Sequence, residues 1–329
     1  MRTTARRSAA LPLLVIGGCS VEQSALHPTG AGAEQIYSLF WVMTIGGGLI
    51  FAAVLLCTLW AIYGGSGIRR TLSAEGMIYG AGVFFPAAVL SALLGYGLYL
   101  MQESAFASSP TGAPQIAVSG EMWWWRVQYR DAQGRSLESA NEVHVPVGET
   151  VNLALTTKDV IHSFWAPQLA GKLDMIPGRT NMLSVTATKP GISRGQCAEY
   201  CGGAHALMSF VVVAHPADEY AQWLDGEAAP AKAPDTEREK LGQDLFLRSG
   251  CGACHAVRGT AAAGTIGPDL THVGSRKSLG AATLNNDEAS FKRWIVDNQH
   301  IKPENGMPPY RIFTEAELDA LAAYLDGLA

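Results

Sequence analysis

Long uncharged stretches dominate the first third of the chain. Residues 36–63 and 76–102 contain no Asp, Glu, Lys or Arg. Each stretch exceeds the roughly 20 apolar residues that a helix needs to cross a bilayer. Trp41 and Trp60 lie near the two ends of the first stretch, where interfacial aromatic residues are typical. The pattern predicts a transmembrane hairpin over residues 30–103, and the alternative is a pair of buried core helices.

The charges around these stretches predict their orientation. Arg69 and Arg70 lie in the connector beside a single acid, Glu75, and positively charged loops remain in the cytoplasm. Both ends of the hairpin then face outside. Residues 1–19 agree, because a basic start and a short apolar run are typical of a signal peptide. Cys19 ends an Ile-Gly-Gly-Cys sequence and is a candidate lipidation site. An ordinary signal peptide with a chance cysteine is the alternative.

The rest of the chain changes from strand patterning to helix patterning. Residues 113–225 contain short β-rich runs separated by Gly and Pro, which predict strands and favour a β-sandwich or barrel. Residues 226–235 are rich in Ala and Pro and predict a linker. Residues 236–329 are expected to be helical, with helices over 240–249 and 289–299.

Composition agrees with a membrane portion joined to soluble domains. Charged residues make up 16% of the 329 residues, below the roughly 25% of soluble domains. The net charge is −5, and the basic residues form no run, which argues against nucleic acid as a partner. The chain has six cysteines. It is long enough to bury a core without disulfides, and its last four cysteines form two local motifs that predict cofactor chemistry.

The first motif, Cys251-Gly-Ala-Cys254-His255, is the attachment sequence of a c-type haem. Two thioether bonds hold the porphyrin, and His255 is placed as an axial ligand. A thioredoxin-like redox pair is the alternative. Met307 lies in a loop before two prolines and is the candidate second axial ligand, since His/Met ligation saturates iron for electron transfer. For Met307 the alternative is a core methionine.

Residues 236–329 resemble class I cytochrome c over nearly their whole length. The resemblance rests on the haem motif, the methionine loop and the sequence Gly267-Pro268-Asp269-Leu270. It implies that the Pro268 carbonyl accepts the ring N–H of His255. Arg276 is a candidate partner of a haem propionate, with a solvated arginine as the alternative.

The second motif gathers sulfur and imidazole, which copper prefers, in the sequence Cys197-Ala-Glu-Tyr-Cys201-Gly-Gly-Ala-His205-Ala-Leu-Met208. Two thiolates four residues apart can bridge two metal ions. His205 supplies one nitrogen, and His162, which follows a strand-like run, is the best candidate for the other. Met208 and the Glu199 carbonyl fit weak axial positions. Tetrahedral zinc and a disulfide between the two cysteines are the alternatives.

Over residues 30–329 the chain resembles the subunit II–cytochrome c fusions of bacterial haem-copper oxidases. The residues that carry the resemblance are the copper motif, His162-Ser-Phe-Trp and Pro177-Gly-Arg179. It implies a two-helix transmembrane hairpin, then an all-β cupredoxin domain (a Greek-key sandwich or barrel), then an all-α cytochrome c domain.

The resemblance also implies roles for single residues. Trp123 is the point where electrons are accepted from cytochrome c, with structural packing as the alternative. The Glu199 side chain is expected to bind magnesium at the interface with subunit I. Family members often carry a glutamate just inside the second helix, linked to proton uptake. Tyr79 occupies that position here and Glu75 is displaced toward the loop, so no proton pathway is assigned.

The function implied is that of the electron-input subunit of a terminal cytochrome c oxidase in the bacterial inner membrane. Electrons would pass from a soluble cytochrome c through haem c and binuclear copper A to subunit I, where oxygen is reduced to water. Subunit III and membrane lipid are further partners, the soluble domains lie on the periplasmic side, and no catalytic residue is expected on this chain. The alternatives are the equivalent subunit of a copper A nitric oxide reductase and a membrane-tethered electron carrier.

Overall fold

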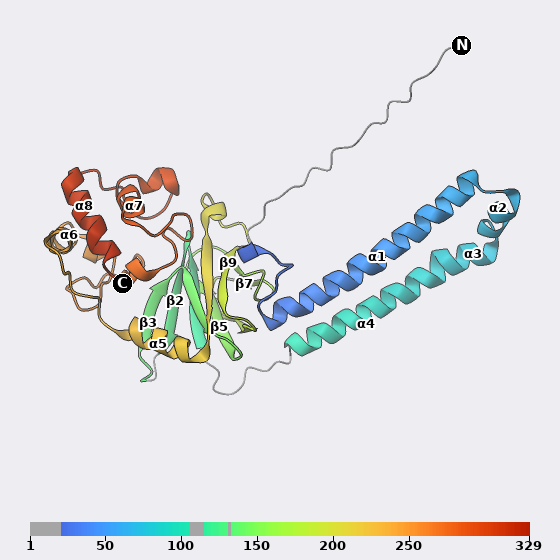
Figure 1. The fold of residues 1–329 in the computed structure, drawn as a ribbon, viewed down its shortest axis with the longest axis horizontal. Helices are drawn as coiled ribbons and strands as arrows, with labels where there is room; N and C mark the ends of the chain where they lie inside the picture. Colours follow the sequence, from blue (N-terminus) through green and yellow to red (C-terminus); the bar gives the residue numbers. More distant parts are fainter. Residues whose placement is uncertain (1–20, 106–114, 131–132) are drawn as a thin grey trace, which may run out of the picture.

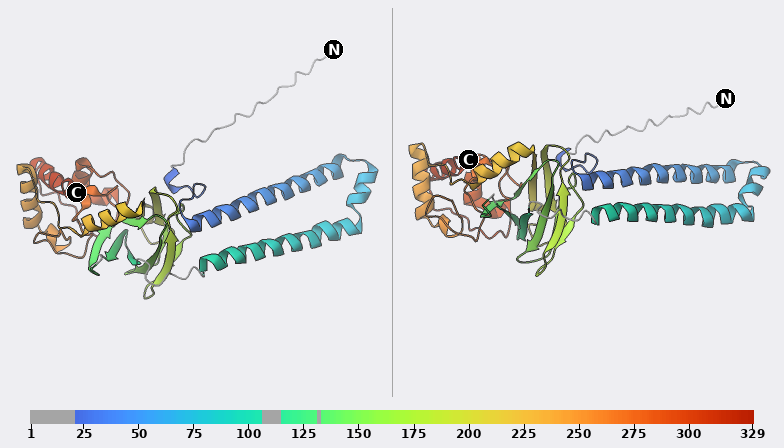
Figure 2. Two further views of the ribbon diagram at one scale, coloured as in Figure 1. Left: turned by 60° about the horizontal axis from the view of Figure 1, so that its bottom comes forward. Right: turned by 90° about the horizontal axis from the view of Figure 1, so that it is seen from below.

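The computed structural model describes residues 21–105, 115–130 and 133–329. Three parts follow one another along the chain: a pair of long helices, a domain of two β-sheets, and a domain of short helices (Figure 1). The long helices extend from one side of the β-domain, and the C-terminal helices lie on its other side (Figure 2). The predicted fold class is therefore confirmed. The candidate lipidation site, Cys19, lies outside the described residues.

The N-terminal hairpin is built from apolar helices with little contact to the rest of the molecule. A short 3-10 turn, η1 (Val21–Gln23), precedes α1 (Ala31–Tyr63), and the return is made by α2 (Ser66–Leu72), α3 (Glu75–Tyr79), the π-turn η2 (Gly80–Phe84) and α4 (Phe85–Ala105). Two helical stretches, Ala31–Tyr63 and Glu75–Met101, are long and apolar enough to cross a membrane, and their most apolar windows bury no residue. Because α1 begins with a polar turn that contains Glu34, its start lies before the uncharged stretch that predicted it.

The β-domain consists of two five-stranded sheets, with strand orders β3-β2-β1-β5-β8 and β4-β10-β9-β6-β7. Pairs β1/β5 and β4/β10 are parallel, and the other pairs are antiparallel. The strands are β1 (Gln115–Glu121), β2 (Trp124–Arg130), β3 (Ser136–Ala140), β4 (Glu142–Pro146), β5 (Thr150–Thr157), β6 (His162–Trp165), β7 (Leu173–Met175), β8 (Asn181–Thr186), β9 (Gly191–Cys197) and β10 (Ser209–His215).

Aromatic side chains fill the space between the two sheets. Trp125 packs edge-to-face on Phe164 and Phe210, at ring-centroid distances of 5.8 and 5.0 Å. Such contacts add about 0.5–1.5 kcal/mol each beyond the area that they bury. The core reaches as far as the cysteine loop, since Cys197, Cys201 and other loop residues belong to the same buried cluster. The metal-binding motif is thus held by the core of the sandwich.

A helix follows the last strand, where the strand and linker patterns predicted none. α5 (Ala217–Ala228) presents Tyr220, Trp223 and Leu224 at helical spacing. The Trp223 ring stacks on His144 with a centroid distance of 3.9 Å and meets Tyr129 edge-to-face. This apolar stripe closes one end of the sandwich, so the irregular connection begins only after Ala228.

The C-terminal domain is a small helical bundle around its own core. Its helices are α6 (Glu237–Arg248), α7 (Glu288–Ile301) and α8 (Glu315–Asp326), with 3-10 turns η4 (Cys251–Ala253) and η5 (Val273–Ser275). Thr236 and Thr314 form capping boxes that begin α6 and α8. These two helices pack so closely at Gly242 that a Cβ there would collide with the Ala320 carbonyl. This contact brings the N- and C-terminal helices of the domain together beside the haem motif.

Candidate functional site

The cysteine loop joins two neighbouring strands of one sheet. β9 ends at Cys197 and β10 begins at Ser209, and the turn η3 (His205–Leu207) lies between them. On the other side of β9, strand β6 begins with His162, and Phe164 pairs with Cys197. Strand register therefore brings His162 to the loop. The ligand atoms of His162, Cys197 and Cys201 all lie within 4.8 Å of one another.

All six sequence-predicted copper ligands lie together around the two sulfur atoms. The two Sγ atoms are 3.7 Å apart, well beyond the roughly 2.05 Å of a disulfide bond. The other distances are 3.8 Å from His162 Nδ1 to Cys197 Sγ, 3.2 Å from the Glu199 carbonyl oxygen to Cys197 Sγ, 3.5 Å from His205 Nδ1 to Cys201 Sγ, and 3.8 Å from Met208 Sδ to Cys201 Sγ. Each sulfur thus has one imidazole and one weak axial donor beside it.

The electrostatics of this cluster suit a soft cation. The hydrogen bond between the two sulfurs lowers the pKa of Cys197 and raises the pKa of Cys201. The lowered pKa of Cys197 favours its thiolate, which is the species that binds metal. A tetrahedral zinc ion would use two sulfurs and two imidazoles. The thioether and the carbonyl oxygen are additional weak donors of the kind found at copper electron-transfer sites, so the donor set fits copper.

Asp159 supports the cluster, and the sequence analysis did not identify it. His162 is fully buried, and its Nε2 donates to Asp159 Oδ1 at 2.8 Å, which leaves Nδ1 free to face Cys197. The other carboxylate oxygen accepts the Met122 N–H at 2.7 Å. Despite burial, these hydrogen bonds lower the pKa of Asp159. An acid three residues before a candidate ligand histidine was the available sequence signal, because carboxylates commonly orient such rings.

Trp123 lies between the cysteine loop and a cavity. Its Nε1–H donates to the Cys201 carbonyl at 2.9 Å, and the residue is 5% exposed. Gly202 lies against the indole, since a Cβ there would be 3.1 Å from Trp123 Cζ2. The cavity has a volume of about 380 Å³, and Met122, Trp123 and Trp124 form part of its wall. A single side chain therefore contacts the metal-binding loop and lines this cavity.

The remaining wall of the cavity carries the haem motif. Cys251, Cys254, His255 and Met307 all line it. His255 Nδ1 lies 2.8 Å from the Pro268 carbonyl oxygen, as the resemblance to cytochrome c implied, and burial lowers the pKa of His255. The ring is also close to Gly267, where a Cβ would lie 2.6 Å from His255 Cε1. Two cysteines, a neutral histidine and a methionine around one apolar cavity fit a covalently bound haem.

The methionine loop is held by amide side chains from the end of α7. Gln299 Nε2 donates to the carbonyls of Asn305 and Met307, at 2.9 and 3.1 Å. The Asn305 side-chain oxygen accepts the Met307 N–H at 3.0 Å. These bonds fix the backbone that presents the thioether. Arg276 also lines the cavity, and its guanidinium donates to the Asp269 carbonyl.

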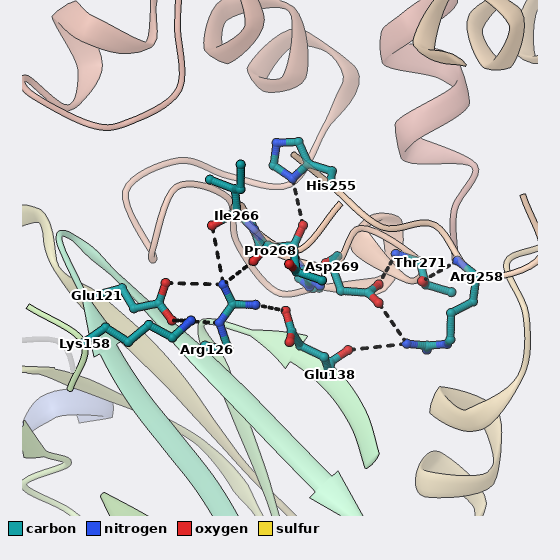
Figure 3. Close-up of polar contacts among 12 residues, drawn as sticks. Glu121, Arg126, Glu138, Lys158, His255, Arg258, Ile266, Pro268, Asp269 and Thr271 are labelled. Atoms are coloured by element: carbon teal, nitrogen blue, oxygen red, sulfur yellow. Dashed lines mark hydrogen bonds and ion pairs between the residues drawn. The ribbon is translucent and has the colours of Figure 1, made fainter. Parts of the chain in front are cut away.

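Arg126 holds the two soluble domains together (Figure 3). It is a buried residue of β2, and its guanidinium forms ion pairs with Glu121, at 2.7 Å, and with Glu138. It also donates to the Thr265 carbonyl at 2.9 Å, in the loop that leads to Pro268. The loop whose carbonyl orients His255 is therefore attached directly to the β-domain, as Figure 3 shows.

The Glu199 carboxylate stays outside the cluster. Its side chain is half-buried, and one oxygen accepts the Tyr200 N–H at 3.3 Å. Within the described ranges, one group of three or more His, Cys, Asp and Glu ligand atoms is close enough to hold a metal ion, and it consists of His162, Cys197 and Cys201. The expected magnesium site is not formed by this chain's described residues alone.

Comparison with known proteins identifies both soluble domains. Residues 126–215 match the family described as cytochrome c oxidase subunit II, periplasmic domain, and residues 239–329 match the family described as cytochrome c. Residues 126–215 therefore form a domain of the cytochrome c oxidase subunit II type, and residues 239–329 form a cytochrome c domain. The subunit II domain implies copper A, and the cytochrome c domain implies haem. With two helices long enough to span a bilayer, this chain is anchored in a membrane.

Relatives extend the likeness along the chain. A protein of Alkalihalophilus pseudofirmus named cytochrome c oxidase subunit 2 is 40% identical over 213 residues, which cover 65% of this chain and 60% of that protein. A Bacillus subtilis protein of the same name is 28% identical over 344 residues, covering 97% of this chain and 96% of the relative. The crystal structure of the periplasmic domain of subunit II of cytochrome oxidase from Bradyrhizobium japonicum is 32% identical, with a TM-score of 0.34, and the match covers 36% of this chain and 96% of that one.

Proposed function

We propose that this chain is the electron-input subunit of a terminal cytochrome c oxidase in a bacterial inner membrane. A soluble cytochrome c is the electron source, and the haem-copper site of subunit I, where oxygen is reduced to water, is the destination. Subunit III is a further partner. The observation that carries the proposal is the shared cavity: its walls hold the haem motif and also Trp123, which is hydrogen-bonded to the cysteine loop.

The copper site that we propose holds two ions between the two thiolates. Cys197 and Cys201 bridge, while His162 and His205 each supply one nitrogen. Met208 and the Glu199 carbonyl are the axial donors, as their distances to the sulfurs support. When bound, the two copper ions supply a one-electron carrier whose charge is shared between the metals.

In the haem site that we propose, Cys251 and Cys254 form the thioether bonds, and His255 and Met307 are the axial ligands. The Pro268 carbonyl fixes the His255 ring through its Nδ1–H. Both axial positions are then filled, so the site suits electron transfer rather than substrate binding.

The structure narrows the choice of electron donor to Trp123. Because it is almost fully buried beneath the C-terminal domain, a soluble protein cannot contact it. We infer that Trp123 accepts electrons from the fused haem domain, and that external donors reduce the haem. The Nε1–H bond to the Cys201 carbonyl continues this route to the copper site.

The remaining assignments place the chain in its complex. The soluble domains face the periplasm, because the arginine-bearing connector is on the cytoplasmic side. The half-buried Glu199 carboxylate is the proposed magnesium ligand at the subunit I interface. Cys19 is the proposed lipid attachment point.

A purified complex tests the function directly. With reduced cytochrome c as donor, we expect oxygen consumption, a c-type haem spectrum, and an electron-spin signal delocalised over two copper ions. Nitric oxide consumption without oxygen consumption would contradict the oxidase assignment. Isolation of the chain without a haem-copper partner would favour a free electron carrier. A one-copper signal would contradict the binuclear site.

A further inference from the structure

Lys302 is a buried lysine with no carboxylate partner within the described ranges. The residue is 2% exposed, and its Nζ donates to the Gly280 carbonyl at 3.1 Å. Among residues 21–105, 115–130 and 133–329, no carboxylate lies within ion-pair distance of this Nζ. Burial lowers the pKa of Lys302 to about 7, although the charge of Cys201 acts to raise it. Lysines buried this deeply are almost always paired, so the position calls for an anionic ligand.

Lys302 lines the haem cavity at the side that meets the cysteine loop. It ends α7 and forms part of the same wall as His255 and Met307. Lys302 binds the Gly280 carbonyl, and the next residue, Ala281, contacts β10: its carbonyl accepts the Ser209 N–H at 3.3 Å. Two residues beyond Lys302, Glu304 lies against the cysteine loop, where a Cβ at Gly203 would be 2.5 Å from Glu304 Oε2. The ammonium group therefore lies between the two proposed redox sites.

The charged side chains that line the cavity differ in whether they are already paired with an opposite charge. Two acids line it, but Glu121 is paired with Arg126 and Asp159 with His162. Two cations line it in the described part of the chain, Arg276 and Lys302. Arg276 is half-buried and Lys302 fully buried. An apolar cavity with two available cations fits a flat apolar ligand that carries two carboxylates.

We propose that Lys302 would bind a haem propionate at the side of the cavity that meets the cysteine loop. The inference rests on the proposed haem site and adds a residue to it. Arg276 is then the partner of the other propionate. The charge-assisted bond repays the burial of the ammonium group.

The test replaces Lys302 in the full-length chain carrying haem and copper. Lys302→Met keeps a similar length and removes the charge, and the haem reduction potential is measured by optical titration. Loss of a cation beside a propionate favours the oxidised haem. We expect the reduced-to-oxidised ratio at a fixed poise to fall about tenfold, which corresponds to about 59 mV for one electron. Lys302→Arg, which keeps the charge, is expected to restore most of the loss.

Lys240→Met is the matched control, because Lys240 is an exposed lysine of the same domain, paired with Glu237. A Lys302→Met potential equal to that of the control would overturn the proposal. If Lys302→Met fails to retain haem, the test is the haem propionate bending band in resonance Raman spectra, compared between Lys302→Arg and the unmodified protein. A shifted band supports the pairing and an unshifted band overturns it. A complex that reduces nitric oxide instead of oxygen would overturn the proposed function while leaving this pairing intact.

Discussion

At the scale of single residues, the metal site depends on a neighbour that contributes no ligand atom. Asp159 accepts the Nε2–H of His162 and so selects the tautomer whose Nδ1 faces Cys197. Removal of such a partner typically costs 10–100-fold in metal affinity. The five ligand side chains of the proposed site are therefore joined by a sixth, Asp159, which only orients one of them.

Asp159→Asn is expected to weaken copper retention by roughly 10–100-fold, because an amide holds the imidazole N–H less strongly than a carboxylate does. Copper content after challenge with a graded chelator is the measurement. Asp244→Asn, at an exposed carboxylate paired with Arg248, is the control. Equal retention in the two variants would show that Asp159 does not orient His162.

Trp123→Phe removes the indole N–H that reaches the Cys201 carbonyl while it keeps an aromatic ring. Haem-to-copper electron transfer is expected to slow about tenfold, the effect of roughly 1.4 kcal/mol on a barrier. Reduction of the haem by soluble cytochrome c is expected to be unchanged, since Trp123 is buried. Stopped-flow absorbance at the haem and copper bands separates the two steps. Slower haem reduction would instead indicate direct contact between Trp123 and the external donor.

At the scale of elements, the contact between α5 and the sheet has a built-in pH dependence. His144 Nδ1 and His215 Nε2 are 2.8 Å apart, and both rings stack with Trp223 of α5. Burial, and for His215 also the neighbouring His144, lowers both pKa values, that of His215 to about 4. The folded contact therefore favours two neutral rings.

The sign of the effect follows from these shifts. Between the ordinary histidine pKa of about 6.5 and the folded value, the detached state binds the proton more readily, so the contact weakens as pH falls. The protection factors of the amide hydrogens of residues 217–228, which correct for the intrinsic pH dependence of exchange, are expected to fall from pH 6.5 to pH 4. His215→Gln is expected to make this change shallower. Protection that is constant over this range would contradict the prediction.

The loop at residues 265–268 depends on Arg126 for its attachment to the β-domain. Arg126→Gln leaves Glu121 and Glu138 without their buried cation, which typically costs about 3–5 kcal/mol. We expect slower haem-to-copper transfer and faster proteolysis after Ala228. Arg238→Gln, which removes an exposed ion pair with Glu288, is the control. Unchanged transfer and proteolysis would show that other contacts suffice to dock the domain.

At the scale of the whole molecule, the three parts lie in the order that the proposed electron route requires. The hairpin extends from one side of the β-domain, and the haem domain covers another side (Figure 2). The β-domain therefore carries the copper loop between a membrane anchor and a haem cavity. The buried position of Trp123 follows from this packing, and in the proposed route external donors therefore act on the haem domain.

The sequence by itself determined the order of the three parts, and it predicted most of the proposed ligands of both cofactors. Five of the six proposed copper ligands lie within the 12 residues Cys197–Met208, and three of the four proposed haem-binding residues lie within Cys251–His255. Ligands so close in the chain share one loop whatever surrounds it, which is why spacing predicts them. Long uncharged stretches and short alternating runs predicted helices and strands for the same local reason.

Tertiary structure decided everything that joins distant segments. Strand register brought His162 beside Cys197, and packing of the haem domain buried Trp123 and Lys302. The role of Arg126 and the docking of α5 also depend on neighbours far away in the sequence, whereas Asp159 lies only three residues before the His162 ring that it orients. A local pattern carries no signal for such contacts, because their stability comes from burial and pairing that arise only when the domains meet.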